Sequence, residues 1–263
     1  MENGGGKDSP LSLFRALEEA LLKEGAAFVS CADLRALPPN LREHFPRGIS
    51  IGVAFNPAVV AGLLHEPSRE FDSEFERTST LRKKLSTVCT EFLHIGGYEA
   101  ITVPASLSQA DPGTLTAPLP HKTVATLAGA GWIGKCALLV TERYGSALRL
   151  VSVLTDAELP TGTPADRSSC GDCKACVDIC PARAPTGESW RAGMSRERLF
   201  DAFACQRWNR HLRESTNFRH PYCGKCVAIC PWTQKYLSRY AGSTTAESLN
   251  DLVLKEPQDK DKV

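Results

Sequence analysis

The chain has 263 residues, 42% hydrophobic and 23% charged, and a formal net charge of +1, so its charge balance favours neither nucleic acid nor an anionic membrane. Its apolar runs are too short to span a bilayer, and Met1–Ser9 lacks the apolar core of a signal peptide. Because eleven cysteines without an export signal indicate metal binding rather than disulfides, we expect a cytoplasmic protein that uses no membrane.

The N-terminal half alternates helical and strand patterns. Ser9 and Pro10 begin a helix with one apolar face, and Gly25 ends it. Further helices are predicted around residues 81–92 and over 124–128. Strands are predicted over residues 49–55, 99–103, 137–140 and 148–154. The pattern indicates an α+β fold with an α/β-type N-terminal domain over residues 1–160.

The composition changes after this domain. Residues 160–169 are rich in Pro, Thr, Gly and Asp, which is typical of a linker or surface loop. Residues 161–240 hold eight of the eleven cysteines and form the second predicted domain. A helix is predicted from near Ser195, with Cys205 after it. Residues 241–263 are polar, and we expect a disordered tail there.

The cysteine spacing carries the strongest chemical signal. The first motif is Cys170-x2-Cys173-x2-Cys176-x3-Cys180-Pro181. In bacterial ferredoxins this run places three thiolates on one [4Fe–4S] cluster and the fourth on another. The second motif is Cys223-x2-Cys226-x3-Cys230-Pro231, which lacks the first cysteine. Two structural zinc sites are the alternative, but zinc requires neither the three-cysteine run nor the Cys-Pro endings.

The missing ligand of the second motif has two candidates. His220 aligns with the vacant position, and Cys205 lies between the motifs. Histidine can replace cysteine on iron, but a thiolate matches the other seven ligands in charge and softness, which favours Cys205. We therefore assign the first cluster to Cys170, Cys173, Cys176 and Cys230. The second cluster is assigned to Cys180, Cys205, Cys223 and Cys226.

Three further cysteines lie outside the motifs. Cys31 and Cys89 fall in predicted regular structure, where a buried, inert thiol is the better interpretation. Cys136 follows a glycine-rich segment, residues 128–135, and so carries more functional weight. The glycine spacing resembles a dinucleotide fingerprint, but a Rossmann loop joins a strand to a helix and the predicted order here is the reverse. A tight turn with close backbone packing is the simpler interpretation.

Together with the cysteine motifs, this segment resembles the epoxyqueuosine reductase family, in a short form without the C-terminal helical-repeat part. The resembling residues are Thr116-Ala117-Pro118, 128–135, Tyr144-Gly145-Ser146, Leu154-Thr155-Asp156, 170–181, Cys205 and 223–232. The resemblance implies a nitroreductase- and reductive-dehalogenase-like domain that binds cobalamin, joined to a ferredoxin-like module with two [4Fe–4S] clusters. It also implies electrons delivered by a ferredoxin or flavodoxin, and it supports Cys205 as a ligand.

Two groups of residues are candidates for corrinoid contacts. The first is His121 with Lys122, for which solvated polar residues at a helix start are an equal alternative. The second lies in the glycine-rich segment and comprises Gly131, Trp132, Ile133, Gly134 and Lys135. Trp132 is equally well explained as a core residue.

The chain departs from the family at the position of its catalytic aspartate, which is Leu115 here and cannot donate a proton. Asp111 or His121 are candidate substitutes. This departure and the missing helical-repeat part both weaken the prediction of epoxide reduction on tRNA. The substrate is therefore left open.

Two functions compete. The first is an oxidoreductase that passes electrons through two clusters to a corrinoid. The second is a non-enzymatic electron-transfer protein that docks to or activates a partner. About 150 residues of patterned sequence exceed what a simple carrier needs, which favours the enzyme. The basic-aromatic stretch 207–213 is interpreted as a solvated helix face rather than as a docking surface for nucleic acid or a redox partner.

Overall fold

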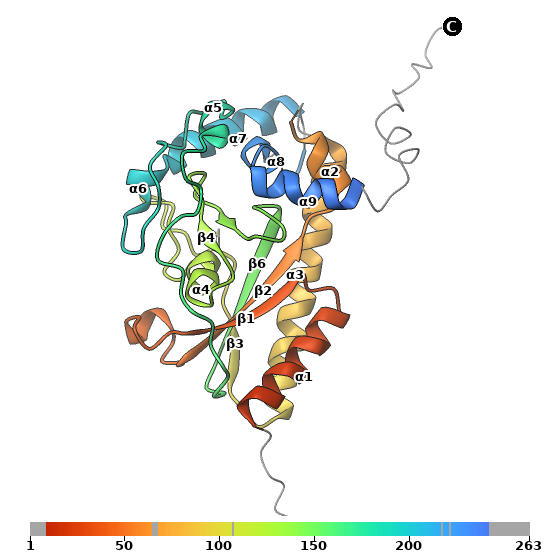
Figure 1. The fold of residues 1–263 in the computed structure, drawn as a ribbon, viewed down its shortest axis with the longest axis vertical. Helices are drawn as coiled ribbons and strands as arrows, with labels where there is room; N and C mark the ends of the chain where they lie inside the picture. The colour runs from red at the N-terminus through yellow and green to blue at the C-terminus, as the bar shows by residue number, and fades with distance from the viewer. Residues whose placement is uncertain (1–8, 65–67, 107, 217, 221, 242–263) are drawn as a thin grey trace, which may run out of the picture.

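The computed structural model describes residues 9–64, 68–106, 108–216, 218–220 and 222–241. Segments 1–8 and 242–263, on which the leader and tail predictions fall, lie outside this range. Figure 1 shows a sheet flanked by long helices, with the short helices of the C-terminal part gathered at one end. In the described ranges, none of the helices combines the length and apolar character needed to cross a bilayer.

The central sheet has four strands in the order β1-β2-β6-β3, and every neighbouring pair is antiparallel. The strands are β1 Phe28–Asp33, β2 Arg47–Ala54, β6 Leu148–Thr155 and β3 Ala100–Thr102. Ile49 on β2 is opposite Cys31 on one side and Val153 on the other. Antiparallel pairing confirms the α+β class, because a doubly wound α/β sheet is largely parallel.

Helices cover both faces of the sheet. α1 (Pro10–Lys23) and α3 (Arg69–Ile95) pack on one face, and α4 (His121–Leu127) packs on the other. β2 has both faces buried because its side chains alternate: Ile49 and Ile51 enter the core under α1 and α3. Gly48 lies on the α4 side, where an added Cβ would approach Val124 Cγ1 to 2.9 Å.

The predicted ends of α1 are confirmed, whereas α3 and α4 begin before the starts predicted at residues 81 and 124. Ser9 Oγ accepts a hydrogen bond from the Ser12 N–H (3.2 Å), and Gly25 adopts φ +102° just after α1. Gly96 caps α3 at its C-terminus. Cys31 and Cys89 are 2% and 0% exposed within the same core, and burial raises the pKa of each thiol to about 12. Both therefore remain neutral, as predicted.

The remaining elements are short, apart from two helices. They are η1 Pro39–Leu41, α2 Pro57–Gly62, β4 Trp132–Ile133, β5 Leu139–Val140, α5 Ala175–Asp178, α6 Arg196–Leu199, α7 Ala202–Thr216, α8 Lys225–Ala228 and α9 Pro231–Ala241. The helix predicted from Ser195 is in fact two helices, because Phe200 is extended (φ −161°) between α6 and α7. Cys205 therefore follows the first of these helices, as predicted, and lies inside the second.

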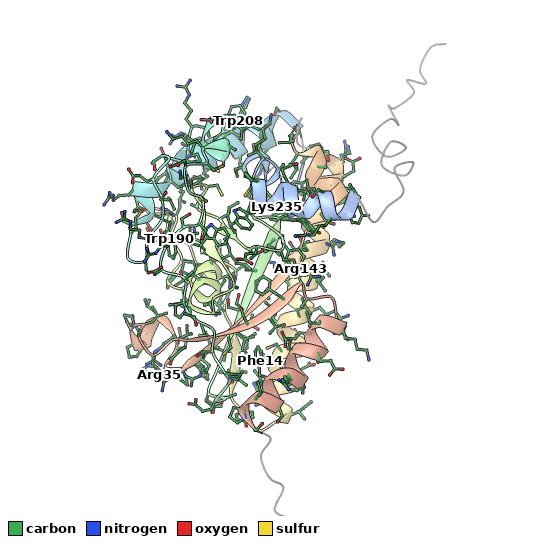
Figure 2. The ribbon with its side chains drawn as sticks, viewed as in Figure 1. Phe14, Arg35, Arg143, Trp190, Trp208 and Lys235 are labelled. Carbon is green, nitrogen blue, oxygen red and sulfur yellow. The ribbon has the colours of Figure 1, made fainter. Side chains whose placement is uncertain are left out.

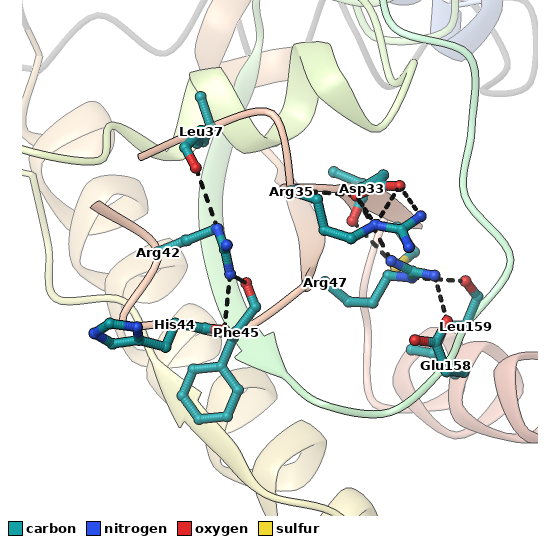
Figure 3. Close-up of polar contacts among 11 residues, drawn as sticks. Asp33, Arg35, Leu37, Arg42, His44, Phe45, Arg47, Glu158 and Leu159 are labelled. Atoms are coloured by element: carbon teal, nitrogen blue, oxygen red, sulfur yellow. Dashed lines mark hydrogen bonds and ion pairs between the residues drawn. The ribbon is translucent and has the colours of Figure 1, made fainter. Parts of the chain in front are cut away.

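The predicted linker is held against the sheet. Ala157 and Leu159 are buried in the core under α1 and α3. Arg47 of β2 forms an ion pair with Glu158 and donates from Nε to the Leu159 carbonyl at 3.3 Å (Figure 3). The Gly162 N–H donates to the Cys31 carbonyl at 2.9 Å. These contacts fix where the chain enters the predicted C-terminal module, residues 161–240.

The C-terminal module is docked on one end of the sheet. α8 and α9 contact α2, and their apolar side chains share one core with it. Gly145, at φ +57°, faces Thr233 so closely that an added Cβ would lie 2.2 Å from the Thr233 nitrogen. The fully buried Thr233 hydroxyl accepts from the Ser146 N–H at 3.1 Å. Module and sheet therefore share buried polar and apolar contacts.

Candidate metal centre

All eight cysteines of the motifs lie in the described part of the chain, and all are free thiols. α5 carries Cys176, α7 carries Cys205 and α8 carries Cys226. The other five lie in the loops beside α5 and α8. α5 and α8 contact each other, which brings the two motifs together.

One group contains Cys180, Cys205 and Cys223. Burial, followed by the neighbouring thiols of Cys180 and Cys223, raises the pKa of Cys205 to about 11. Asn209, one turn further along α7, bridges two members: its Nδ2 donates to Cys205 Sγ (3.6 Å), and its Oδ1 accepts from the Cys223 N–H (3.1 Å). The structure therefore gathers three of the four residues assigned to the second cluster.

The other group contains Cys170 and Cys230. Both belong to an apolar cluster around Trp132. Burial is the main cause that raises the pKa of Cys230, and Cys170 adds to it. Trp132 Nε1 is buried here and has no hydrogen-bond partner among the described residues. A buried N–H without a protein acceptor fits a site that holds a sulfur-rich cluster, whose sulfurs accept hydrogen bonds.

Cys136 lies between the two groups. It is 4% exposed, and the neighbouring thiols of Cys176 and Cys226 influence its pKa, which lies well above the usual value for a thiol. They are the third cysteine of the first motif and the second cysteine of the incomplete second motif, and they are assigned to different clusters. The sequence indicated a functional role for Cys136 only through its position after the glycine-rich segment. Its contact with both motifs depends on the tertiary fold.

The grouping of the thiols suits clusters. In the described ranges, no three His, Cys, Asp or Glu side chains converge as the ligands of a single metal ion would. Ligands of a [4Fe–4S] cluster need not converge in this way, because each thiolate binds a different iron.

His220 has other partners. Its backbone N–H donates to Asp72 Oδ1 at 2.7 Å, and its Nδ1 lies 3.1 Å from the same oxygen. Its Nε2 is 3.7 Å from Glu76 Oε2, and its ring stacks on Phe75. Both ring nitrogens thus face carboxylates of α3 rather than the thiol groups.

The first pair of predicted corrinoid contacts is buried against protein. His121 Nδ1 lies 3.2 Å from Ser152 Oγ, and burial lowers its pKa to about 4. Lys122 Nζ donates to the Ala137 carbonyl at 2.8 Å, and burial lowers the pKa of this amine as well. The polar atoms of both side chains are therefore engaged within the domain.

The glycine-rich segment packs directly on the cysteine motifs. The Lys135 ammonium, on a residue only 4% exposed, donates to the Gly171 carbonyl between Cys170 and Cys173 (2.8 Å). An added Cβ at Gly134 would lie 3.7 Å from Cys170 Sγ.

The hydrophobic members of the same segment are core residues. Trp132 meets Trp232 edge-on at 5.1 Å, and Ile133 is buried beneath α6. At Gly131 an added Cβ would lie 2.2 Å from the Val140 carbonyl oxygen. The close backbone packing predicted for this segment is confirmed.

Leu115 stands in a turn that is tied to the C-terminal module. It adopts φ +54°, an unfavourable conformation for a branched side chain. Arg196 of α6 donates to its carbonyl at 2.7 Å and also to the Thr114 carbonyl. Asp111, a candidate proton donor, instead accepts the Thr114 N–H at 2.8 Å and is exposed.

A small cavity lies beside this turn. It has a volume of about 120 Å³, and its lining includes Ile101, Ala117 and Leu119. That volume is below the roughly 300–1,000 Å³ of typical small-molecule sites. A corrinoid therefore does not fit inside it in this conformation.

Comparison with protein families and curated proteins agrees with this geometry. Residues 169–233 match the 4Fe-4S double cluster binding domain, which confirms the predicted double-cluster module. The chain is 27% identical to an epoxyqueuosine reductase of Vibrio cholerae over 84% of this chain and 60% of that protein. It is 34% identical to that of Synechococcus sp. over 46% of this chain and 37% of that protein. These matches confirm the family resemblance.

Solved structures share the fold. A reductive dehalogenase described as B12-dependent superposes with a TM-score of 0.69 over 96% of this chain and 37% of its own, at 15% identity. An epoxyqueuosine reductase bound to a tRNA stem loop gives 0.58 over 86% and 66%, at 19% identity. The chain spans about 33–60% of the length of the curated relatives it matches.

Proposed function

We propose that this chain is an iron–sulfur oxidoreductase of the epoxyqueuosine reductase type, which passes electrons through two [4Fe–4S] clusters to an acceptor in its N-terminal domain. The observation that carries this proposal is the packing of the glycine-rich segment on the first cysteine motif, through Lys135 and Gly171. A module whose cysteine loop rests on the interior of another domain is suited to deliver electrons into that domain.

The cluster ligands follow from the two groups of thiols. Cys170, Cys173, Cys176 and Cys230 hold the cluster beside Trp132, and the grouping of Cys170 with Cys230 supports this. Cys180, Cys205, Cys223 and Cys226 hold the cluster beside α7. The contacts of Asn209 support the choice of Cys205, and the carboxylate partners of His220 weigh against His220.

The acceptor is a corrinoid in this proposal. Its support is the shared fold with a reductive dehalogenase described as B12-dependent and the sequence similarity to epoxyqueuosine reductases. A bound corrinoid would supply reduced cobalt as the reacting metal. The polar side chains predicted to contact it have protein partners, so we assign no contact residue and no cobalt-dependent step.

The residue at position 115 bears on the substrate class. The turn at Leu115 holds no side chain that can donate a proton at the family's aspartate position. Reduction of an epoxide on tRNA, which the relatives' name and the tRNA-bound structure suggest, therefore needs a different proton source here. A second candidate function, electron transfer to a partner protein without catalysis, is favoured by the same leucine.

Anaerobic purification tests the proposal. Iron and sulfide analysis should find about eight irons per chain, four for each cluster. Retention of added cobalamin through gel filtration, with a change in its spectrum on reduction of the clusters, would support the reductase. Fewer than about six irons would contradict the two-cluster assignment. Two clusters without cobalamin retention would leave the electron carrier as the better function.

A further inference from the structure

The exposed side of α7 has features of a protein-docking surface. No residue of this 15-residue helix is fully buried. Its solvent side presents Phe203, which is 38% exposed, together with Arg207, Arg210 and one acidic residue, Glu214. Among the ion pairs found in the described part of the chain, none involves either arginine. The helix therefore offers positive charge and an apolar side chain to a partner.

The opposite side of the same helix carries a cluster ligand. With 3.6 residues per turn, Arg207 and Arg210 point away from Cys205 and Asn209. Cys205 lies with Cys180 and Cys223 in the thiol group of the second cluster. Since an α-helix with its side chains is about 10–12 Å across, one helix separates the basic surface from this cluster.

The two clusters differ in their access to the surface. Two thiols assigned to the first cluster, Cys170 and Cys230, share an apolar cluster with Trp132, Trp190 and Trp232. The second cluster's thiols lie under α7, at the end of the molecule remote from α1 (Figure 1). Trp208 on α7 and Phe14 on α1 mark these two ends in Figure 2. Electrons that enter at α7 therefore reach the second cluster before the first.

We propose that the exposed face of α7, formed by Phe203, Arg207 and Arg210, docks an acidic, low-potential one-electron carrier protein that reduces the second cluster. The proposal rests on the proposed function in one respect, the presence of that cluster. The carrier loses one electron, and the cluster gains it and passes from the 2+ to the 1+ state. No bond is made or broken. Nucleic acid would also suit a basic face, but only a redox partner benefits from the cluster ligand behind it, and the proposed reductase needs that partner to be a donor.

A charge-reversal variant tests this surface. The probe is flavodoxin hydroquinone, an acidic carrier that becomes a semiquinone as it gives up one electron. In Arg207→Glu/Arg210→Glu, the second-order rate of cluster reduction should fall at least about tenfold, because electrostatic steering raises association rates by about 10–1,000-fold. Its dependence on ionic strength should also weaken. Reduction by dithionite should be unchanged.

The matched control reverses the same amount of charge elsewhere. Arg15→Glu/Lys23→Glu alters two exposed residues of α1, at the other end of the molecule. This control should keep the wild-type rate within about twofold, well short of the steering effect. If the charge-reversal variant of α7 loses iron, the neutral variant Arg207→Gln/Arg210→Gln replaces it. A smaller decrease in the rate of cluster reduction is then expected.

The outcomes separate the docking site from the function. An unchanged rate of cluster reduction by flavodoxin, in an α7 variant with full iron content, would overturn the docking site. An equal decrease of this rate in the α1 control would overturn it too. So would a wild-type protein whose clusters flavodoxin cannot reduce. Lost binding of a tRNA stem loop with an unchanged flavodoxin rate would assign the surface to nucleic acid instead. Missing clusters in the wild-type protein would contradict the proposed function itself.

Discussion

The side-chain amide of Asn209 donates to the sulfur of Cys205 from one helical turn away, at 3.6 Å. The same amide accepts from the backbone of Cys223, so the lone cysteine of α7 is fixed against the second motif. This arrangement supports Cys205 as the ligand that the incomplete motif lacks.

Replacement of the lone cysteine should remove one cluster. Cys205→Ser should lower the iron content from about eight to about four per chain, since each cluster holds four irons. His220→Ala is the matched variant and should keep both clusters, because its ring nitrogens face Asp72 and Glu76. Iron and sulfide analysis of anaerobic protein measures both. The reverse pattern would make His220 the ligand.

Cys136 should tune the clusters without holding iron. Its thiol contacts Cys176 and Cys226, and hydrogen bonds to cluster sulfurs stabilise the reduced state. Cys136→Ala should therefore retain the iron and lower the reduction potential of at least one cluster. Cys136→Ser, which keeps a donor, should stay closer to the wild type. Redox titration followed by electron paramagnetic resonance gives both potentials, and identical values in all three proteins would refute this role.

His121 should make the fold sensitive to mild acid. Burial lowers its folded pKa from 6.5 to about 4, so between these values the unfolded chain binds a proton that the folded chain does not. Stability should therefore decrease as pH falls from 6.5 towards 4, by at most about 3 kcal/mol from this group. The Tm of anaerobic protein at several pH values measures the loss. His121→Gln should show a shallower decrease, and equal slopes would exclude His121 as a cause.

Gly131 should be required for packing whether or not cobalamin is present. In Gly131→Ala, the new Cβ would meet backbone atoms of Val140, and such overpacking typically costs about 1–3 kcal/mol. Gly62→Ala is the control, because an added Cβ there meets nothing within 4 Å and alanine favours a helix. Urea unfolding of both variants gives the comparison. A variant that loses cobalamin binding but no stability would instead assign Gly131 to the cofactor.

Local signals predicted much of the fold. Ser9, Pro10 and Gly25 defined α1 correctly because capping depends on residues close in sequence. For β1, Phe28–Asp33, regular structure was predicted at Cys31 but no strand was delimited, because the segment is a strand through its pairing with β2, which lies over ten residues away. The break between α6 and α7 was also missed. Phe200 is extended there and packs with the core beneath α6, a tertiary contact that no helical pattern reveals.

The candidate site was also predictable where it depends on local spacing and not where it depends on tertiary contacts. Cysteine spacing identified the cluster module because each loop must wrap a cube within a few residues. The partners of His220 lie on α3, more than 140 positions earlier in the chain, so spacing alone left Cys205 and His220 as alternatives. The predicted corrinoid contacts followed from resemblance. They remain predictions, because His121 and Lys122 use their polar atoms within the protein.

The close approach of Gly145 to Thr233 has a consequence for how this molecule exchanges electrons. A freely tethered ferredoxin domain can swing between a donor and an acceptor, but a domain anchored by a fully buried threonine cannot. Under the proposed function, we therefore expect the distance between the clusters and the N-terminal domain to stay constant while electrons pass. The rate of electron transfer would then depend on the arrival of the donor and not on a domain movement.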